Sequence, residues 1–226
     1  MRRRTRHKKG AIRAGVGAQA ALGFRSHSGW AVLVAVAGPA SSPAVIERRR
    51  IEIADPAIAG SKQPYHAAEG WPLKKAEEYL NRCTRTSNLL ARRAVRAVVR
   101  DLQKRGYDVA GCGVLLASGR PITTLEATLA SHALIHTAEG ELFRNALIQA
   151  CERYELPVAK VKERELFACG ATKLGISEAN LHSRIAELGR PIGPPWSQDE
   201  KYAALVGWLA LAATTRRPGR RSRRKK

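Results

Sequence analysis

The feature of this sequence that most constrains its fold is a long amphipathic segment, residues 73–105. Apolar side chains recur there at spacings of three and four, which is the period of one face of an α-helix. Gly106 follows directly and predicts the end of the helix. Strand patterns lie before this helix, and helix and strand patterns alternate after it. Such an order is typical of an α/β domain with a mixed sheet.

Two strands are predicted before the long helix. Residues 23–37 (GFRSHSGWAVLVAVA) read as a first, buried strand, and residues 38–43 supply the glycine and prolines of a turn. Residues 44–54 alternate apolar and charged side chains, which places Val45, Arg49 and Ile51 on one predicted face. We expect the two strands to pair antiparallel, with residues 55–72 as a long loop behind them.

The remaining elements alternate between strands and helices. Thr123 and Glu126 form a capping box, which predicts a short helix as far as about Leu134. Ser177 and Ser197 are predicted to begin two later helices as N-cap residues. The predicted strands are residues 108–118 and 158–164, and the predicted helices are residues 138–155, 177–188 and 197–211.

Both ends of the chain are strongly basic. The chain has a formal net charge of +21, and residues 1–13 hold seven Lys or Arg while residues 216–226 hold eight, with no acid in either run. We therefore expect a basic, flexible N-terminal tail over residues 1–22, a domain over residues 23–212 and a basic C-terminal tail over residues 213–226. Such runs suit a polyanion, because each cation that meets a phosphate releases a counterion. The alternative is a pair of solubilising or targeting segments.

The four cysteines, at positions 83, 112, 151 and 169, are too widely spaced for a typical zinc motif or a disulfide framework. Buried thiols in a reducing compartment are the better interpretation. No apolar segment is long enough to span a bilayer. We therefore expect a soluble, cytoplasmic protein that has no membrane partner.

Three segments carry a resemblance to a known superfamily. They are Ser28–Leu33 (SGWAVL), Ala150–Val161 (ACERYELPVAKV) and Asp199–Leu211 (DEKYAALVGWLAL). In this order they resemble the first strand, the E-L-P-V helix end and the last helix of the ribonuclease-H-like superfamily, in its Holliday-junction-resolvase branch. The resemblance covers most of residues 23–212. It implies a mixed five-stranded sheet with helices on both faces, nucleic acid as the partner, and carboxylates that hold Mg²⁺ or Mn²⁺ for phosphodiester cleavage.

Most of that carboxylate set has no counterpart here. No acidic residue precedes Glu47, so the first-strand aspartate is missing, and the strand glutamate falls near Ala117 or Ser118. On the last helix Asp199 matches the first aspartate, whereas the second falls on Tyr202, with Glu200 nearby. The resemblance therefore favours nucleic-acid binding over the ordinary two-metal reaction.

A second polar set could replace the missing carboxylates. His132 and His136 are four residues apart with Glu139 three further on, so one continuous helix would place them on a shared face. The candidate catalytic residues are His136, Glu139, Glu141 and Asp199, the candidate metal ligands are Glu139, Asp199 and Glu200, and the accessory candidates are His27, His66, Glu69 and His132. The alternative is structural: acids stabilise the first turn of a helix, and histidines near strand ends often belong to the core.

The other face of the long helix carries a stripe of arginines. Few acids lie nearby to pair with them, so we count them as candidates for phosphate contact, with an ordinary solvated face as the alternative. The candidate nucleic-acid-binding residues are Arg82, Arg85, Arg92, Arg96, Arg100 and Arg144, with Arg93 on the same stripe.

Two hypotheses follow from the sequence. In the first, a ribonuclease-H-like domain binds nucleic acid and hydrolyses it through a rearranged His, Glu and Asp set. In the second, the fold persists as a non-catalytic nucleic-acid or ribonucleoprotein binder with a decayed site. The sequence does not distinguish DNA from RNA, and a homodimer stays open as an alternative to a monomer.

Overall fold

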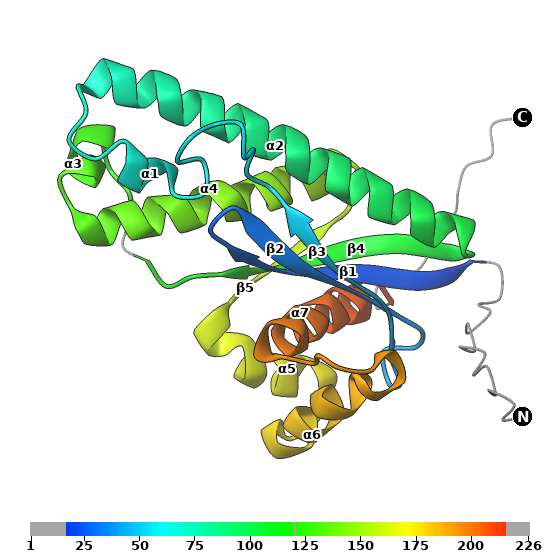
Figure 1. Cartoon of the computed structure of the whole chain (residues 1–226). Helices are drawn as coiled ribbons and strands as arrows, with labels where there is room; N and C mark the ends of the chain where they lie inside the picture. Colours follow the sequence, from blue (N-terminus) through cyan, green and yellow to red (C-terminus); the bar gives the residue numbers. More distant parts are fainter. Residues whose placement is uncertain (1–16, 120, 216–226) are drawn as a thin grey trace, which may run out of the picture.

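A computed structural model describes residues 17–119 and 121–215, which form one five-stranded sheet with helices on both faces (Figure 1). The order across the sheet is β3-β2-β1-β4-β5. The first three strands pair antiparallel, and β4 and β5 run parallel to β1. The strands are β1 (Ala18–His27), β2 (Trp30–Ala37), β3 (Ala44–Glu52), β4 (Tyr107–Leu116) and β5 (Val158–Lys162).

Two helical layers cover the sheet. The long helix α2 and helix α4 lie on one face, and α5, α6 and α7 lie on the other (Figure 1). Short helical turns also occur at Glu163–Glu165 and Arg190–Ile192. The helices are α1 (Pro64–Ala67), α2 (Leu73–Lys104), α3 (Leu125–Leu129), α4 (His132–Glu152), α5 (Leu166–Leu174), α6 (Glu178–Leu188) and α7 (Gln198–Thr215).

This architecture confirms the predicted fold class, a mixed five-stranded α/β sheet with helices on both faces. Cys83, Cys112 and Cys151 are buried as free thiols, as expected. Among the described residues we find no helix with both the length and the apolar character needed to cross a bilayer. Most of both basic tails, residues 1–16 and 216–226, lies outside the described residues.

The prediction of a single first strand over residues 23–37 is wrong, because this segment is part of a β-hairpin. Strands β1 and β2 are joined by Ser28 and Gly29, and Gly29 has a φ of 82°, a conformation that favours glycine. The strand also begins at Ala18, within the range 1–22 that the sequence had assigned to the tail. The run RSHSG, residues 25–29, has no apolar side chain and was the available signal for this turn.

Strand β3 departs from simple alternation. Ala35 pairs with Glu47 and Val36 with Val45, so Ile46 is an extra residue that forms a β-bulge. The bulge places Val45 on the α7 side of the sheet, whereas Ile51 packs on the α2 side. The predicted shared face of Val45 and Ile51 is therefore wrong.

The helical region after β4 also differs from the prediction. The cap of α3 is Thr124, whose hydroxyl accepts the Ala127 N–H, and this helix ends at Leu129. Helix α4 then runs without a break from His132, so His132 and His136 do share one helix. The prediction did not include α5, whereas the Ser177 cap of α6 is confirmed.

Helix α7 lies unusually close to the centre of the sheet. A Cβ added to Gly23 of β1 would stand 1.8 Å from the Ala203 carbonyl oxygen, and one added to Gly113 of β4 would stand 2.2 Å from that of Val206. Only glycine fits at such distances. Helix α7 is thereby held against β1 and β4, and Asp199 in its first turn lies beside His27 at the end of β1.

Candidate functional site

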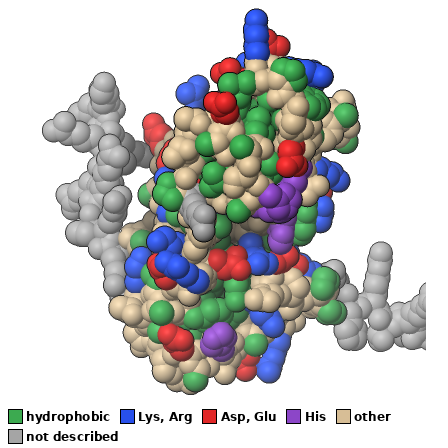
Figure 2. Space-filling view, turned by 90° about the vertical axis from the view of Figure 1, so that its left-hand side faces the viewer, with side chains coloured by type: hydrophobic (Ala, Val, Ile, Leu, Met, Phe, Trp, Pro, Cys, Tyr) green, Lys and Arg blue, Asp and Glu red, His purple; other side chains and the backbone are tan. Residues whose placement is uncertain are grey.

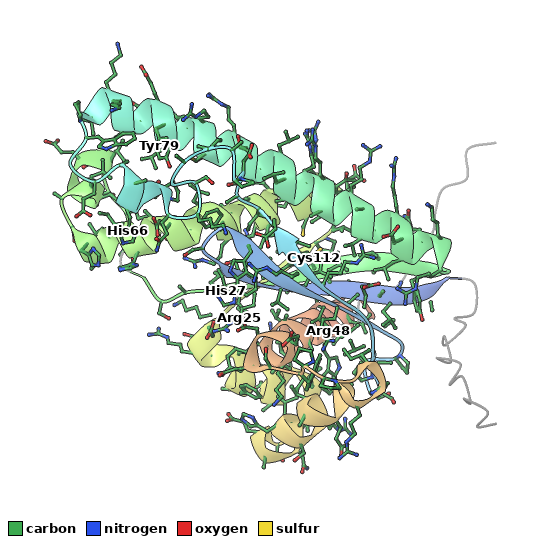
Figure 3. All side chains as sticks on the ribbon, viewed as in Figure 1. Arg25, His27, Arg48, His66, Tyr79 and Cys112 are labelled. Carbon is green, nitrogen blue, oxygen red and sulfur yellow. The ribbon has the colours of Figure 1, made fainter. Side chains whose placement is uncertain are left out.

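The end of β1 brings together Arg25, His27, Glu163 and Asp199, a group we call the β1-end cluster (Figure 3). The Arg25 guanidinium donates to both carboxylate oxygens of Glu163, from Nη2 at 2.9 Å and from Nε at 3.2 Å. Its Nη1 also contacts Asp199 Oδ1. A guanidinium thus lies between one carboxylate that directly follows β5 and another in the first turn of α7.

This arrangement does not fit the two-metal site that the resemblance implies. A pair of divalent cations needs several carboxylates whose charge is free for the metals. Here both carboxylates already pair with Arg25, whose positive charge offsets part of theirs and would oppose a cation in the same place. After β4, Ala117 and Ser118 offer no carboxylate, as expected from the sequence.

His27, the last residue of β1, completes the cluster. Its Nε2 lies 3.0 Å from Asp199 Oδ2 but has no aligned hydrogen bond, and its ring stacks on Trp30 at 4.1 Å. Arg50 lies over the Trp30 ring at 3.7 Å. Burial lowers the pKa of His27 and the positive Arg25 lowers it further, although Glu163 opposes the shift. The neutral imidazole is therefore favoured here.

Glu200, a predicted metal ligand, contacts the beginning of its own helix instead. Its carboxylate accepts the Ser197 backbone N–H at 2.8 Å and contacts the Ser197 hydroxyl, and that hydroxyl accepts the Asp199 N–H at 3.2 Å. These are the reciprocal bonds of a capping box. The Ser197 cap is thus confirmed, and Glu200 stabilises the helix turn that carries Asp199.

A second group lies in the other half of the molecule, where His66 of α1 faces α4. His66, His132 and His136 offer ring nitrogens that all lie within 4.8 Å of one another. We call these three residues the histidine cluster. The His132 and His136 Nε2 atoms are 3.0 Å apart, and both side chains are exposed. Figure 2 shows a group of histidine side chains in the upper half of the face that it views, above a band of acidic and basic side chains.

Glu139 lies directly behind the histidine cluster. Its side chain is only 4% exposed, and its Oε1 accepts the His66 backbone N–H at 3.1 Å and lies 2.9 Å from His66 Nδ1. The predicted candidates are therefore divided between two places: His132, His136, Glu139 and the accessory His66 come together, while Asp199 and the accessory His27 belong to the β1-end cluster.

The remaining candidates lie around these two groups. Glu141 is half-buried and, together with Glu139, contributes to the raised pKa of Tyr65, for which burial is the main cause. Glu69 is exposed and makes no ion pair with a described residue. Arg144 packs over Gly140, and its pKa is lowered by burial although Glu141 and Glu163 oppose the shift.

Six exposed arginines occupy one side of α2, which we call the arginine face. None of them makes an ion pair with a residue that the structure describes. Arg85 and Arg92 also line a groove of ≈ 340 Å³ between α2 and α4, opposite Arg153. The residues of the arginine face are Arg82, Arg85, Arg92, Arg93, Arg96 and Arg100.

Sequence reasoning missed two residues of the β1-end cluster. Arg25 is a charged residue inside an apolar strand, at the end where the resemblance leads one to expect an aspartate, and that anomaly was the available signal. Glu163 follows β5 directly and carried no comparable signal. Arg153 was also missed, because its role depends on the packing of α4 against α2.

No family model matches this sequence, and no curated protein matches it. Two solved structures of RuvC from Thermus thermophilus are similar to the chain, one of them in complex with a Holliday junction substrate. The identities are 11% and 12%, and each match covers 87% of this chain and 95% of the other, with a TM-score of 0.48. At such identities the residues of the site must be interpreted from the geometry of this chain alone.

Proposed function

We propose that this chain binds the phosphate backbone of nucleic acid along the arginine face of α2 and does not cleave it by two-metal chemistry. The observation that carries this proposal is the set of six exposed arginines without an acidic partner among the described residues. At 3.6 residues per turn they lie within an arc of about 100° around the helix. Their charges therefore point toward one partner surface.

The length of the arginine face matches a nucleic-acid duplex. From Arg82 to Arg100 the rise of the helix is about 27 Å, which corresponds to about eight base-pair steps. The groove that Arg85, Arg92 and Arg153 line lies beside this face and adds a third cation to one place. Arginine suits phosphate because its planar fork donates two parallel hydrogen bonds.

Other arginines of the domain are already committed to internal contacts. Arg49 contacts Asp101 at 2.9 Å, and Arg105 contacts Glu47 at 2.8 Å. Arg48 donates to the backbone carbonyl oxygen of Gly193 at 3.3 Å. The contrast with the arginine face supports its role as the binding surface, because charges without an internal partner keep their full attraction for phosphate.

The β1-end cluster supports the second half of the proposal. Cleavage by the superfamily's reaction requires divalent cations at the position where Arg25 now pairs with Glu163 and Asp199. The candidates for a rearranged catalytic set, Glu139 and Asp199, contact different partners in different clusters. The non-catalytic hypothesis is thus the one that the geometry supports better.

The basic tails would add phosphate contacts outside the domain. Replacing the eight basic residues of 216–226 by Gln should weaken binding to all sequences and flatten its dependence on salt. Titrations of a labelled duplex at several salt concentrations would measure this slope. An unchanged slope would show that the C-terminal tail does not contact the nucleic acid.

The arginine face is tested with the variant Arg92→Gln/Arg96→Gln. If both arginines contact phosphate, the slope of log affinity against log salt should decrease by about 2, and affinity should fall on duplex, hairpin and single-stranded probes alike. Fluorescence anisotropy with DNA and RNA forms of each probe gives both quantities. It also shows which nucleic acid the chain prefers.

The matched control is Arg184→Gln/Arg190→Gln. These two arginines are exposed on the opposite side of the sheet, on and after α6, so this variant loses the same net charge. We expect it to keep nearly the whole salt slope. Equal losses in both variants would show that net charge, and not the arginine face, determines binding.

The absence of two-metal cleavage is tested on the same probes and on a four-way junction with Mg²⁺ or Mn²⁺. We expect binding without cleavage products. Cleavage that requires Mg²⁺ or Mn²⁺ and is abolished by Asp199→Asn or Glu139→Gln would overturn this part of the proposal and favour the catalytic hypothesis.

A further inference from the structure

The histidine cluster has features that nucleic-acid binding does not explain. Three imidazoles from two helices converge on one point at the surface, although the chain holds only six histidines in all. Two of the ring nitrogens, on His132 and His136, face each other at 3.0 Å. Without a proton or a cation between them, the lone pairs of two such nitrogens repel each other.

We propose that His66, His132 and His136 bind one transition-metal ion of the Zn²⁺ class, with a fourth position open to solvent. This site is separate from the β1-end cluster, and its metal class differs from the Mg²⁺ or Mn²⁺ that the superfamily resemblance implies. Imidazole nitrogen is a ligand for zinc, copper, nickel and iron, whereas Mg²⁺ takes oxygen ligands.

The spacing of the ring nitrogens is close to that of a tetrahedral site. With Zn–N bonds of about 2.0–2.1 Å, two ligand nitrogens in tetrahedral geometry lie about 3.4 Å apart. The distance between the His132 and His136 nitrogens is 3.0 Å, and the three ligand atoms lie within 4.8 Å of one another. The three nitrogens are thus grouped at the scale of a single metal site.

The backbone gives two of the ligands a fixed relationship. His132 and His136 are four residues apart on the unbroken helix α4, so their side chains leave the same face one turn apart. Both are exposed, which leaves an outer side free for water or another ligand. The partial positive charge at the beginning of α4 opposes a cation, but three nitrogen donors and a nearby carboxylate outweigh a partial charge.

Glu139 supplies the supporting carboxylate. In many metal sites a ligand histidine donates its other ring N–H to a carboxylate, which fixes the tautomer and strengthens the ligand. His66 Nδ1 lies 2.9 Å from Glu139 Oε1 and is buried, without an aligned hydrogen bond in the present geometry. If Nδ1 is committed to Glu139, Nε2 is the nitrogen of His66 that is left to bind the metal. Glu139 is therefore a positioning residue.

The test uses the full chain, treated with a chelator and then titrated with Zn²⁺ by calorimetry. We expect one equivalent to bind, and elemental analysis after desalting to give one zinc per chain. Co²⁺ provides a second readout that needs no variant, because tetrahedral cobalt absorbs visible light far more strongly than octahedral cobalt. A strong visible spectrum that Zn²⁺ displaces is the expected result.

Variants assign the ligands. His132→Ala/His136→Ala should lose the bound equivalent and the cobalt spectrum, and since both side chains are exposed its unfolding curve should stay cooperative. The matched control is His7→Ala/His182→Ala, which removes two histidines elsewhere and should bind as the original chain does. Glu139→Gln should weaken Zn²⁺ binding by about 10- to 100-fold.

Two results would overturn the proposal. One is a native chain that binds no Zn²⁺ and gives no tetrahedral cobalt spectrum. The other is a His132→Ala/His136→Ala variant that retains one equivalent with unchanged affinity. Neither result depends on nucleic-acid binding, so the two proposals fail separately.

Discussion

The β1-end cluster and the histidine cluster lie on the same side of the molecule, yet they treat charge in opposite ways (Figures 2 and 3). In the first, two carboxylates pair with a guanidinium that belongs to the chain itself. In the second, three imidazoles face one another at the surface, with a buried carboxylate behind them. The carboxylates of the first cluster therefore already have a cationic partner, whereas no Lys or Arg among the described residues pairs with the buried carboxylate of the second.

This contrast shows why carboxylate count alone is a poor guide to a metal site. Asp199 lies at the position that the superfamily resemblance assigns to a metal ligand, but its partner Arg25 removes the need for a cation. The histidine cluster has one acidic residue nearby and still provides the donor geometry. The identity of the residue opposite each donor therefore decides whether an ion can bind.

The largest expected effect comes from Arg25→Asp, which would remove the cationic partner of Glu163 and Asp199. Three carboxylates would then meet in a half-buried place, and we expect the free energy of unfolding to fall by about 2–4 kcal/mol. Mn²⁺ should restore part of this loss, up to about 2.7 kcal/mol at a hundredfold excess over its dissociation constant. Urea unfolding with and without Mn²⁺ measures both changes.

The control for that substitution is Arg190→Asp, on an arginine whose side chain is 77% exposed. It makes the same change in charge and should alter stability by less than about 1 kcal/mol. An Arg25→Asp chain that is as stable as the original would contradict the structural role given to Arg25.

The next effect compares two glycines, one in the strand that carries the β1-end cluster and one in the helix that carries the histidine cluster. Gly23→Ala would force the added methyl group against the Ala203 carbonyl of α7. We expect the free energy of unfolding to fall by about 1–3 kcal/mol or more. The matched change is Gly140→Ala in α4, where the added Cβ would meet only the flexible end of Arg144. There the better helix propensity of alanine offsets the crowding, so stability should change by less than about 1 kcal/mol. Thermal unfolding of the two variants gives the comparison.

A smaller effect is expected on the pH dependence of stability, and it involves only the β1-end cluster. Burial and Arg25 lower the pKa of His27 below its ordinary value of 6.5, so the folded chain binds fewer protons than the unfolded chain. The stabilisation from His27 should be complete above pH 6.5 and decrease as pH falls from there toward the folded pKa. His27→Gln should flatten this part of the stability profile. A profile identical to that of the original chain would exclude His27 as the source.

The smallest effect is expected for Glu200→Gln. Glutamine can still accept the Ser197 N–H, so the capping box is kept and stability should change by less than about 0.5 kcal/mol. Zn²⁺ binding should also stay the same, because Glu200 lies outside the histidine cluster. Calorimetry and unfolding of this variant distinguish a helix cap from a metal ligand, since loss of a ligand would lower metal affinity.

Elements with a strong local pattern could be predicted from the sequence. Helix α2 was predicted as residues 73–105 and runs over Leu73–Lys104, because its apolar stripe is long and ends at a glycine. The Ser177 and Ser197 caps were also predicted, since a cap depends on residues within one turn. The Ile46 bulge was missed because one extra residue leaves too weak a pattern to be recognised. The Ser28–Gly29 turn was missed although the polar run of residues 25–29 marks it.

The candidate site could be predicted only in part, for a different reason. The spacing of His132 and His136 is local, so the sequence indicated their shared face once the helix proved continuous. The contacts between Arg25 and Glu163, and between His66 and Glu139, join residues 138 and 73 positions apart. Only the packing of the layers brings such pairs together. The sequence therefore supplied the residues but not their grouping.

The β-bulge at Ile46 has a consequence for how this domain can vary in length. Because Ile46 has no partner of its own on β2, a chain without it could pair Val45 and Glu47 with successive residues of β2 and restore a regular ladder. Every side chain from Glu47 onward would keep the face it now has, so Arg49 would still meet Asp101. Loss of one residue normally turns a strand over, but at this position relatives could lose one and leave the sheet intact.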